Sequence, residues 1–376
     1  MTKLHISLVG GQPMPSYLGI IDDMPDDVIL IYSSKSERQA NIIAKTIQHT
    51  IGKKCRKIRF SAFNIMEIKE QMIELEKELS DYKQVDINLS SGSKPWSILF
   101  YDFFKTHSNV NCLFVDQNNN IFNLETNESH KIKYSPSWEN IFALNETKIK
   151  SNKKYADYTD EDHYAAQEIR QLRELERKSF KEITEELAKD KKHASQKIRI
   201  GHLFINWDKA ANTYHCNYSS FKETIKTDIS SPNVMNLMLN TGWFELEVAQ
   251  FLSKWKFAKE IWLNCEFTTT QSITQDTKNE IDIIINTGEK LLFVECKTQV
   301  YQITDVDKFN NAVRTYGGLA AKRLFITDEI MKKEAAEKCS NYEMLFYSLK
   351  ELKKSEEKVN NFFETLTAEM NESNKK

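Results

Sequence analysis

Apolar runs alternate with amphipathic segments over the first third of the chain. The apolar runs predict β-strands at residues 4–9, 28–32, 55–60, 85–89 and 112–116. Between several of them, apolar positions recur at helical spacing and predict helices at residues 37–51, 62–79 and 95–104. Strands and helices that alternate in this way indicate an α/β fold with a mostly parallel, doubly wound sheet. Ligands of such sheets bind at the carboxyl ends of the strands.

The loops at these carboxyl ends are rich in glycine, serine and lysine. The loop from Asn88 to Lys94 joins a strand to a helix N-terminus, and its small residues leave backbone N–H groups free to meet an anion. It lacks the glycine spacing of a Walker loop or a dinucleotide-binding loop, so turn and cap chemistry alone explains it equally well. The candidate ligand-binding residues are Gly10, Gly11, Gln12, Ser33, Ser34, Lys35, Asn88, Ser90, Ser91, Gly92, Ser93 and Lys94.

A second α/β pattern occupies the last part of the chain. An apolar helical pattern at residues 243–255 precedes an apolar strand that begins near residue 279. Residues 291–294 are continuously apolar and predict a fully buried strand. A further helix at residues 305–316 and a strand at residues 324–327 complete the pattern, which predicts a second α/β domain.

Charged residues at the end of the buried strand suggest chemistry. Successive side chains of a strand point to opposite faces, so Glu295 and Lys297 share one face. A charged pair there is costly to desolvate unless it is compensated, and a divalent cation such as Mg²⁺ or Mn²⁺ would do so. Asp282, Glu295 and the backbone carbonyl of Cys296 are the candidate metal ligands, and Lys297 would orient the attacking water. Taken alone, Glu295 and Lys297 would more often form a plain ion pair at a sheet edge, and only the order of all three acidic motifs favours the metal site.

An acid on the preceding helix would complete the site. Glu245 and Glu247 lie two residues apart on that helix, so only one of them can face the metal. We expect Glu245 in this role and Glu247 in solvent. Glu280 shares a face with Asp282 and is a possible second acid, and Gln299 could contact the same water or remain solvated. The order of acid, acid and Glu-x-Lys favours a metal-dependent nuclease.

The middle of the chain is less informative. Residues 120–152 suggest a hairpin and a polar connector, and residues 160–197 are so densely charged that we expect one long surface helix. Basic residues of that helix could guide a nucleic acid, although a solvated face explains them more simply. Residues 201–218 resemble a short β unit. We therefore divide the chain into domains at 1–140 and 231–376, with a connector at 141–230.

Composition limits the class of protein. The 376 residues are 40% hydrophobic and 28% charged, with a formal net charge of −2, so no global basic field indicates nucleic-acid binding. Long apolar stretches and a basic, apolar leader are missing from the sequence, so we expect a cytoplasmic protein without membrane contact. The six cysteines lack paired spacing, which argues against zinc ribbons and disulfide scaffolds.

Together, the two halves resemble the CARF-domain effector nucleases of type III CRISPR systems. These proteins join a CRISPR-associated Rossmann-fold sensor to a PD-(D/E)xK restriction-endonuclease-like domain. The loop from Asn88 to Lys94 is similar to the ligand loop of the sensor, with serines at 90 and 93 where threonines are commoner. In the second half the resemblance lies in Gly242 to Glu245, Asn279 to Asp282, Glu295 to Lys297 and Tyr316 to Gly318.

The resemblance implies a homodimer whose paired sensors bind one cyclic oligoadenylate, usually the tetra-adenylate. It also implies metal-dependent, sequence-tolerant cleavage of single-stranded RNA or DNA, with nicking of duplex DNA in some members, through Glu245, Asp282, Glu295 and Lys297. Two alternatives stay open. The chain could be a DNA restriction or repair endonuclease that needs no small ligand, or a nucleotide sensor without catalysis.

Overall fold

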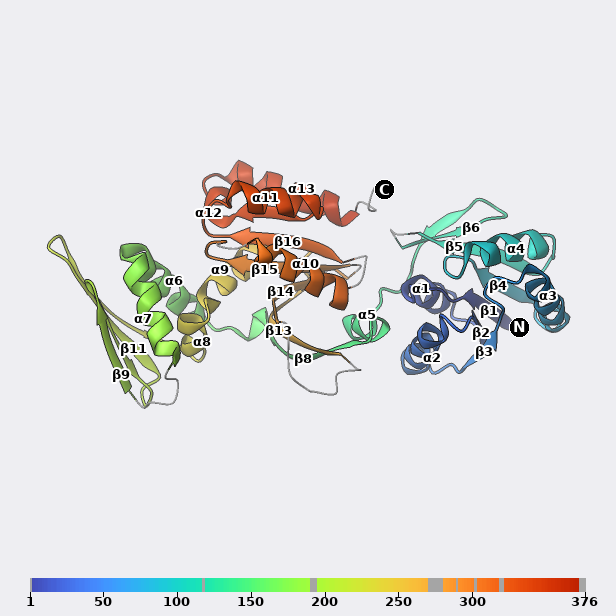
Figure 1. The fold of residues 1–376 in the computed structure, drawn as a ribbon, viewed down its shortest axis with the longest axis horizontal. Coiled ribbons are helices and arrows are strands. Elements are labelled where there is room, and N and C mark those ends of the chain that lie inside the picture. The colour runs from blue at the N-terminus through green and yellow to red at the C-terminus, as the bar shows by residue number, and fades with distance from the viewer. Residues whose placement is uncertain are drawn as a thin grey trace.

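The computed structural model describes residues 2–116, 119–189, 195–269, 280–288, 290–300, 303–317 and 321–371. Figure 1 shows three sheets spread along the longest axis of the molecule, with the C-terminal sheet between the other two. Within the described residues, no helix is both long and apolar enough to cross a bilayer.

The N-terminal sheet confirms the predicted doubly wound α/β fold. Its strands run in the order β3-β2-β1-β4-β5-β6-β7, and the first five pair in parallel. Helices α1 and α2 pack on one face, and α3 and α4 pack on the other. The strands are β1 (Lys3–Leu8), β2 (Asp27–Tyr32), β3 (Cys55–Arg59), β4 (Gln84–Asn88), β5 (Val110–Val115), β6 (Asn120–Asn123) and β7 (Ser129–Lys131). The helices are α1 (Met14–Asp23), α2 (Glu37–Ile51), α3 (Ile65–Leu79) and α4 (Lys94–Phe104).

Helix α1 is an element that the sequence pattern did not predict. It connects β1 to β2 and begins directly after the loop at Gly10. Pro13 and Pro15 are residues typical of a loop. Proline is nevertheless tolerated in the first turn of a helix, because the N–H groups there have no intrahelical partner. Tyr17, Ile20 and Ile21 of α1 are buried in the core between the helix and the sheet.

The C-terminal domain is built on a six-stranded sheet in the order β17-β16-β15-β14-β13-β8. Strands β15, β16 and β17 pair in parallel, and the other neighbours pair antiparallel. One face packs against α9, α12 and α13, and the other packs against α5, α10 and α11. The strands are β8 (Thr147–Lys154), β13 (Glu260–Thr269), β14 (Glu280–Asn286), β15 (Leu291–Lys297), β16 (Lys322–Thr327) and β17 (Leu345–Ser348). The helices are α5 (Trp138–Leu144), α9 (Gly242–Leu252), α10 (Thr304–Tyr316), α11 (Lys333–Asn341), α12 (Leu349–Leu352) and α13 (Glu356–Asn371).

The region assigned to a connector, 141–230, is largely structured. Strand β8 is an edge strand of the C-terminal sheet, and a short 3-10 helix (Tyr155–Asp157) follows it. The single helix expected over 160–197 is two helices, α6 (Asp160–Leu175) and α7 (Arg177–Lys189), which separate at Glu176. A four-stranded antiparallel sheet follows, and it shares one hydrophobic core with α6, α7, α8 and α9. Its strands are β9 (Ser195–Ile200), β10 (Leu203–Asp208), β11 (Thr213–Ser219) and β12 (Thr224–Ser230), and helix α8 (Val234–Leu239) leads to α9.

Candidate active site and ligand-binding loops

The candidate active site lies where β14 and β15 separate. Their antiparallel ladder ends at the pair Ile283 and Val294, one position before Asp282 and Glu295 would face each other. Beyond that point the backbone N–H of Cys296 donates to Oδ2 of Asp282 at 2.7 Å instead of to a backbone carbonyl. The side chain of Asp282 therefore takes the place of the next rung of the sheet.

Lys297 completes a compact charged group with both acids. Its Nζ lies 2.6 Å from Oε1 of Glu295 and 3.6 Å from Oδ2 of Asp282. This geometry confirms that Glu295 and Lys297 share a face of β15. Burial opposes the charge on Lys297, but Asp282 and Glu295 outweigh it and raise the pKa of the ammonium group. Lys297 is therefore a fixed positive charge and a hydrogen-bond donor near neutral pH.

Helix α9 brings Glu245 to this group and carries Glu247 away from it. Glu245 lies in the first turn of α9 and is only 7% exposed. Burial, followed by the charges of Asp282 and Glu280, raises the pKa of Glu245 well above its ordinary value. Glu247 forms ion pairs with Arg170 and Lys353, so the expectation that it is solvated is wrong.

The site holds more negative than positive charge. Burial, followed by the charge of Asp282, raises the pKa of Glu295 to about 8 despite the ion pair with Lys297. Burial also raises the pKa of Asp282, against the opposing effects of Lys297 and the Cys296 N–H. A hard divalent cation prefers such oxygen ligands and would offset the surplus charge, so the donor set fits Mg²⁺ or Mn²⁺.

The other residues expected near this site are spread over the surrounding surface. Gln299 on the loop after β15 and Glu280 at the start of β14 are exposed. Two residues of the quoted motifs, Asn279 and Gly318, lie outside the described residues. The carboxylates of Glu245, Asp282 and Glu295 do not all come within 4.8 Å of one another, whereas those of Glu174, Asp328 and Glu329 do.

Two arginines of α6 form ion pairs that support the candidate active site, and the sequence pattern did not predict this role. Arg170 joins Glu247 of α9 to Asp328 after β16, and Arg173 also binds Asp328. Asp328 is fully buried, and its backbone N–H donates to the carbonyl of Lys297 at 3.2 Å. Helix α6 thereby links the helix that carries Glu245 to the strand that carries Lys297. The spacing of Arg170 and Arg173 predicts that they share a helix face. It does not predict their partner, Asp328, which follows about 155 residues later in the chain.

The predicted ligand loops meet at the carboxyl ends of three neighbouring strands of the N-terminal sheet. They follow β1, β2 and β4, which are neighbours in the strand order β2-β1-β4. A Cβ on Gly10 would come within 2.7 Å of the backbone nitrogen of Gly92, so the first and third loops touch through glycine. The Ser91 hydroxyl donates to the carbonyl of Gln12 at 2.9 Å and fastens the same two loops together.

The structure divides the candidate ligand residues into two sets. Asn88, Ser90 and Ser33 hold the loops in shape: the amide oxygen of Asn88 accepts from the N–H of Ser90, the Ser90 hydroxyl accepts from Val115, and the Ser33 hydroxyl accepts from Lys35. Ser93 caps α4 by accepting from the Trp96 N–H. The second set consists of the exposed residues, which are Gly11, Gln12, Ser34, Lys35 and Lys94.

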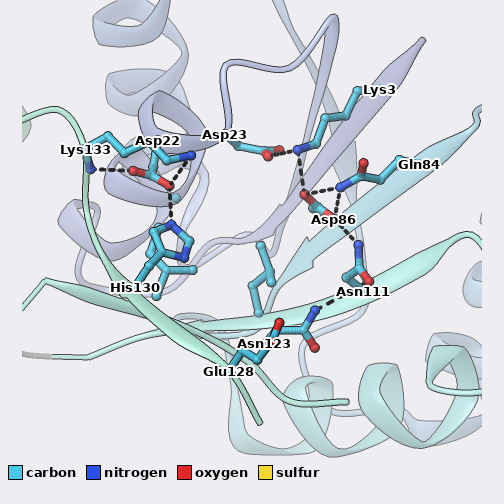
Figure 2. A pocket seen from close by; sticks show the side chains of 13 residues that line it. Lys3, Asp22, Asp23, Gln84, Asp86, Asn111, Asn123, Glu128, His130 and Lys133 are labelled. Atoms are coloured by element: carbon cyan, nitrogen blue, oxygen red, sulfur yellow. Dashed lines mark hydrogen bonds and ion pairs between the residues drawn. The ribbon is translucent and has the colours of Figure 1, made fainter. Parts of the chain in front are cut away.

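A polar pocket of about 270 Å³ lies at the amino ends of β1 and β4, away from these loops. Figure 2 shows Asp22 between His130 and Lys133, and Lys3 between Asp23 and Asp86. These pairs attach the C-terminal end of α1 to β1, β4, β7 and the segment after β7. The charged groups of the pocket therefore join elements of the N-terminal domain to one another.

The comparisons with known proteins agree with this architecture. The family model of the Card1 CARF domain matches residues 4–147. None of the curated proteins matches the chain. Can2 from Sulfobacillus thermosulfidooxidans, solved with cyclic tetra-adenylate, is 14% identical with a TM-score of 0.71, over 99% of this chain and 100% of that chain.

Two further solved structures are similar. Protein VC1899 from Vibrio cholerae is 14% identical with a TM-score of 0.74, over 97% of this chain and 98% of that chain. A type III CRISPR defence DNA nuclease activated by cyclic oligoadenylate is 16% identical with a TM-score of 0.57, over 88% of this chain. The match covers 46% of that nuclease. Residues 4–147 therefore match the Card1 CARF domain, and the fold of the chain is similar to those of Can2 and of the type III CRISPR defence nuclease.

Proposed function

We propose that the chain is a metal-dependent endonuclease, switched on by a cyclic oligoadenylate, that cleaves single-stranded RNA or DNA with little sequence specificity in type III CRISPR defence. The observation that carries this proposal is the grouping of Asp282, Glu295 and Lys297 where β14 and β15 separate, in a chain with a CARF domain. The chemistry suits phosphodiester hydrolysis, because two largely buried carboxylates and one ammonium group lie together.

The residues divide the catalytic work as follows. Asp282 and Glu295 would hold a divalent cation, which supplies Lewis-acid activation of water and neutralises phosphate charge when bound. Lys297 keeps its proton, so it donates hydrogen bonds to the attacking water or to a phosphate oxygen and offsets the negative charge of the transition state. Glu245 contributes a further carboxylate at the edge of the site. The Cys296 carbonyl stays a candidate third ligand.

The ligand loops supply the sensing step. Their exposed lysines, Lys35 and Lys94, and the free backbone around Gly11 suit the phosphates of a cyclic nucleotide. A ring with repeated units is most simply bound by two copies of the same loops, so we propose one ring for each homodimer, with the tetra-adenylate as the expected ring.

Helix α5 offers a physical link between the two functions. Nδ2 of Asn140 donates to the hydroxyls of Tyr17 on α1 and Thr50 on α2, at 2.8 and 3.1 Å. Two residues later, Phe142 packs edge-on against Phe293 of β15, the strand that ends at Lys297. Helix α1 begins at the ligand loop, so a ring that moves this helix would also press on the strand of the active site.

The test is a cleavage assay on the purified full chain. The protein is incubated with Mn²⁺ or Mg²⁺ and with labelled single-stranded RNA, single-stranded DNA or supercoiled plasmid, with and without cyclic tetra-adenylate. We expect cleavage only with both metal and ring, and none after EDTA or in Asp282→Asn. Cleavage at the same rate without the ring would favour the alternative, a ligand-independent DNA endonuclease.

A further inference from the structure

The four-stranded sheet β9–β12 has one face that no helix of the chain covers among the described residues. Its other face packs on α6 and α7 through Leu203, Ile205 and Trp207 of β10 and through Tyr214 and Cys216 of β11. Because side chains alternate along a strand, the residues between these point away from the helices. In Figure 1 this sheet lies at the end of the molecule opposite the sensor domain.

The register of the strands arranges these outward residues in rows. Phe204 pairs with Arg199 of β9 on one side and with Asn217 of β11 on the other, and Asn217 pairs with Lys226 of β12. The next row begins with Lys197, which pairs with Asn206. We call the set Lys197, Arg199, Phe204, Asn206, Asn217 and Lys226 the outer face.

The bases of the outer face differ from those of the charged helices α6 and α7. Along α6, α7 and α13 lysines and arginines pair with acids, whereas Lys197, Arg199 and Lys226 make no ion pair with any described residue. Arg199 lies over the ring of Phe204, with 5.4 Å from its guanidinium carbon to the ring centroid. The acid of these two rows, Asp228, lies 2.7 Å from Nδ1 of His215, and Asp208 of the following row accepts from the backbone N–H groups of Ala210 and Ala211. The free charge of the outer face is therefore positive.

Two amide groups between these bases lack hydrogen-bond partners among the described residues. The Oδ1 atoms of Asn206 and Asn217 are shielded from solvent, and neither accepts a hydrogen bond from a described residue. Shielded polar atoms of this kind are usually satisfied, so both amides keep an unused acceptor beside these bases. Proteins bind phosphates with unpaired cations, and they bind unstacked bases with aromatic rings, arginine side chains and amides. The outer face presents all of these groups on an open sheet.

We propose that the outer face binds a single-stranded nucleic acid and holds the substrate of the nuclease outside its active site. The inference rests on the proposed function and adds a substrate-binding surface to it. Lys197, Arg199 and Lys226 contact phosphates, and Arg199 with Phe204 stacks on a base. A duplex fits less well, because its bases are already stacked and cannot reach the ring.

The test measures binding apart from cleavage. Fluorescence anisotropy of a labelled DNA or RNA strand of roughly 20 nucleotides is followed on the full chain in EDTA over a range of salt concentrations. The triple variant K197A/R199A/K226A is compared with K178A/K181A/K189A, which removes three lysines from the exposed side of α7. We expect the outer-face variant to bind roughly ten-fold more weakly and to lose about 2 from its salt slope, since each phosphate contact contributes about 0.7. F204L should weaken binding roughly ten-fold through lost stacking.

Several results would overturn the assignment. Equal affinities and salt slopes in the two triple variants would remove the outer face from nucleic-acid binding. Stronger loss for a matched duplex than for the single strand would show a backbone site instead. A change from dimer to monomer in the outer-face variant, measured by light scattering, would make the face an interface between copies. Binding is read without metal, so an absence of cleavage counts against the nuclease and not against this surface.

Discussion

At the scale of single residues, Lys297 is the most informative side chain of the site. A partly buried ammonium group is costly on its own, and the two acids that keep it charged would also be the metal ligands. The ion pair and the catalytic role are therefore not competing explanations. The same contact that stabilises the apo site places the ammonium where a phosphate would enter.

Replacing Lys297 by methionine keeps most of the side chain's length and removes its charge. We expect the rate of cleavage to fall by roughly 100-fold or more, because the hydrogen-bond donor to the reacting group is lost. Binding of the cyclic ligand should not change. Lys308→Met, on the exposed side of α10, is the matched control for loss of a lysine. Steady-state rates near those of wild type in Lys297→Met would remove this residue from the mechanism.

Asp23 in the sensor domain carries the clearest dependence of stability on pH. Burial opposes its ionisation, but the hydrogen bond and charge of His5 and the contact with Lys3 outweigh it and lower the pKa of Asp23 from 3.8 to about 2. An acid with a lowered pKa stabilises the fold above its unfolded pKa, and this stability is lost as the pH falls toward 2. The shift corresponds to roughly 2 kcal/mol at neutral pH.

Asp23→Asn should therefore cost roughly 2 kcal/mol of unfolding free energy at pH 7, and the difference from wild type should shrink between about pH 4 and pH 2. Urea unfolding at pH 7, 5 and 3 measures both. Asp102→Asn, at an exposed ion pair on α4, is the control and should cost little at any pH. A difference for Asp23→Asn that did not change with pH would show that lost packing dominates.

Sequence could predict residues whose position follows from strand alternation, and it failed where partners are distant in the chain. Glu295 and Lys297 share a face because they are two apart on one strand. By contrast, the loop pattern from Asn88 to Lys94 could not separate residues that shape the loop, such as Asn88 and Ser90, from exposed Lys94. Both sets are small and polar, and only their hydrogen bonds distinguish them.

At the scale of elements, α6 shows why a charged helix was taken for a solvated one. Its surface is charged almost throughout, yet the side chains of Arg170 and Arg173 are only 23% and 12% exposed. Their guanidinium groups also lie over the ring of Trp243 at the start of α9. A basic residue of a helix can be buried when an acid from another element pairs with it. The periodicity of the helix itself does not predict such a partner. Strand β13 was missed for a related reason, since its place is fixed by pairing with β8 and β14.

Breaking the brace between α6 and the active site should affect both stability and catalysis. Arg170→Met leaves the buried carboxylate of Asp328 with fewer partners, which should cost roughly 3 kcal/mol of unfolding free energy. We also expect a lower kcat with little change in KM, because α9 and the end of β15 lose their common support. Arg170→Lys should recover part of both.

The measurements are urea unfolding and steady-state cleavage, with Lys178→Met on the exposed face of α7 as the control. If Arg170→Met lost stability but kept its kcat below the unfolding transition, the brace would be structural only.

At the scale of the whole molecule, α5 belongs to two cores. Leu144 packs with α1 and α2 in the sensor domain, and Phe142 packs with Phe267 and Phe293 in the C-terminal domain. Arg38 of α2 also pairs with Glu146 just after α5. A rigid helix shared in this way transmits a movement only if the ligand favours one arrangement of the two domains.

Asn140→Ala should weaken this link without touching either site. We expect the ratio of ring-stimulated to basal cleavage to fall several-fold, while calorimetry shows nearly unchanged affinity for the ring. Asn145→Ala, at the C-terminal end of the same helix, is the control. An unchanged ratio in Asn140→Ala would place the coupling elsewhere.

The central claim is that a ligand bound at the loops of one domain turns on hydrolysis in the other. Its most direct test is the rate of single-strand cleavage against the concentration of cyclic tetra-adenylate, for wild type, Lys94→Ala and Glu295→Gln. Lys94→Ala should shift the midpoint to higher ring concentration and reach the same plateau, because excess ligand restores occupancy. Glu295→Gln should bind the ring with wild-type affinity and show no plateau. A rate that did not depend on the ring, or a plateau that Glu295→Gln retained, would contradict the account.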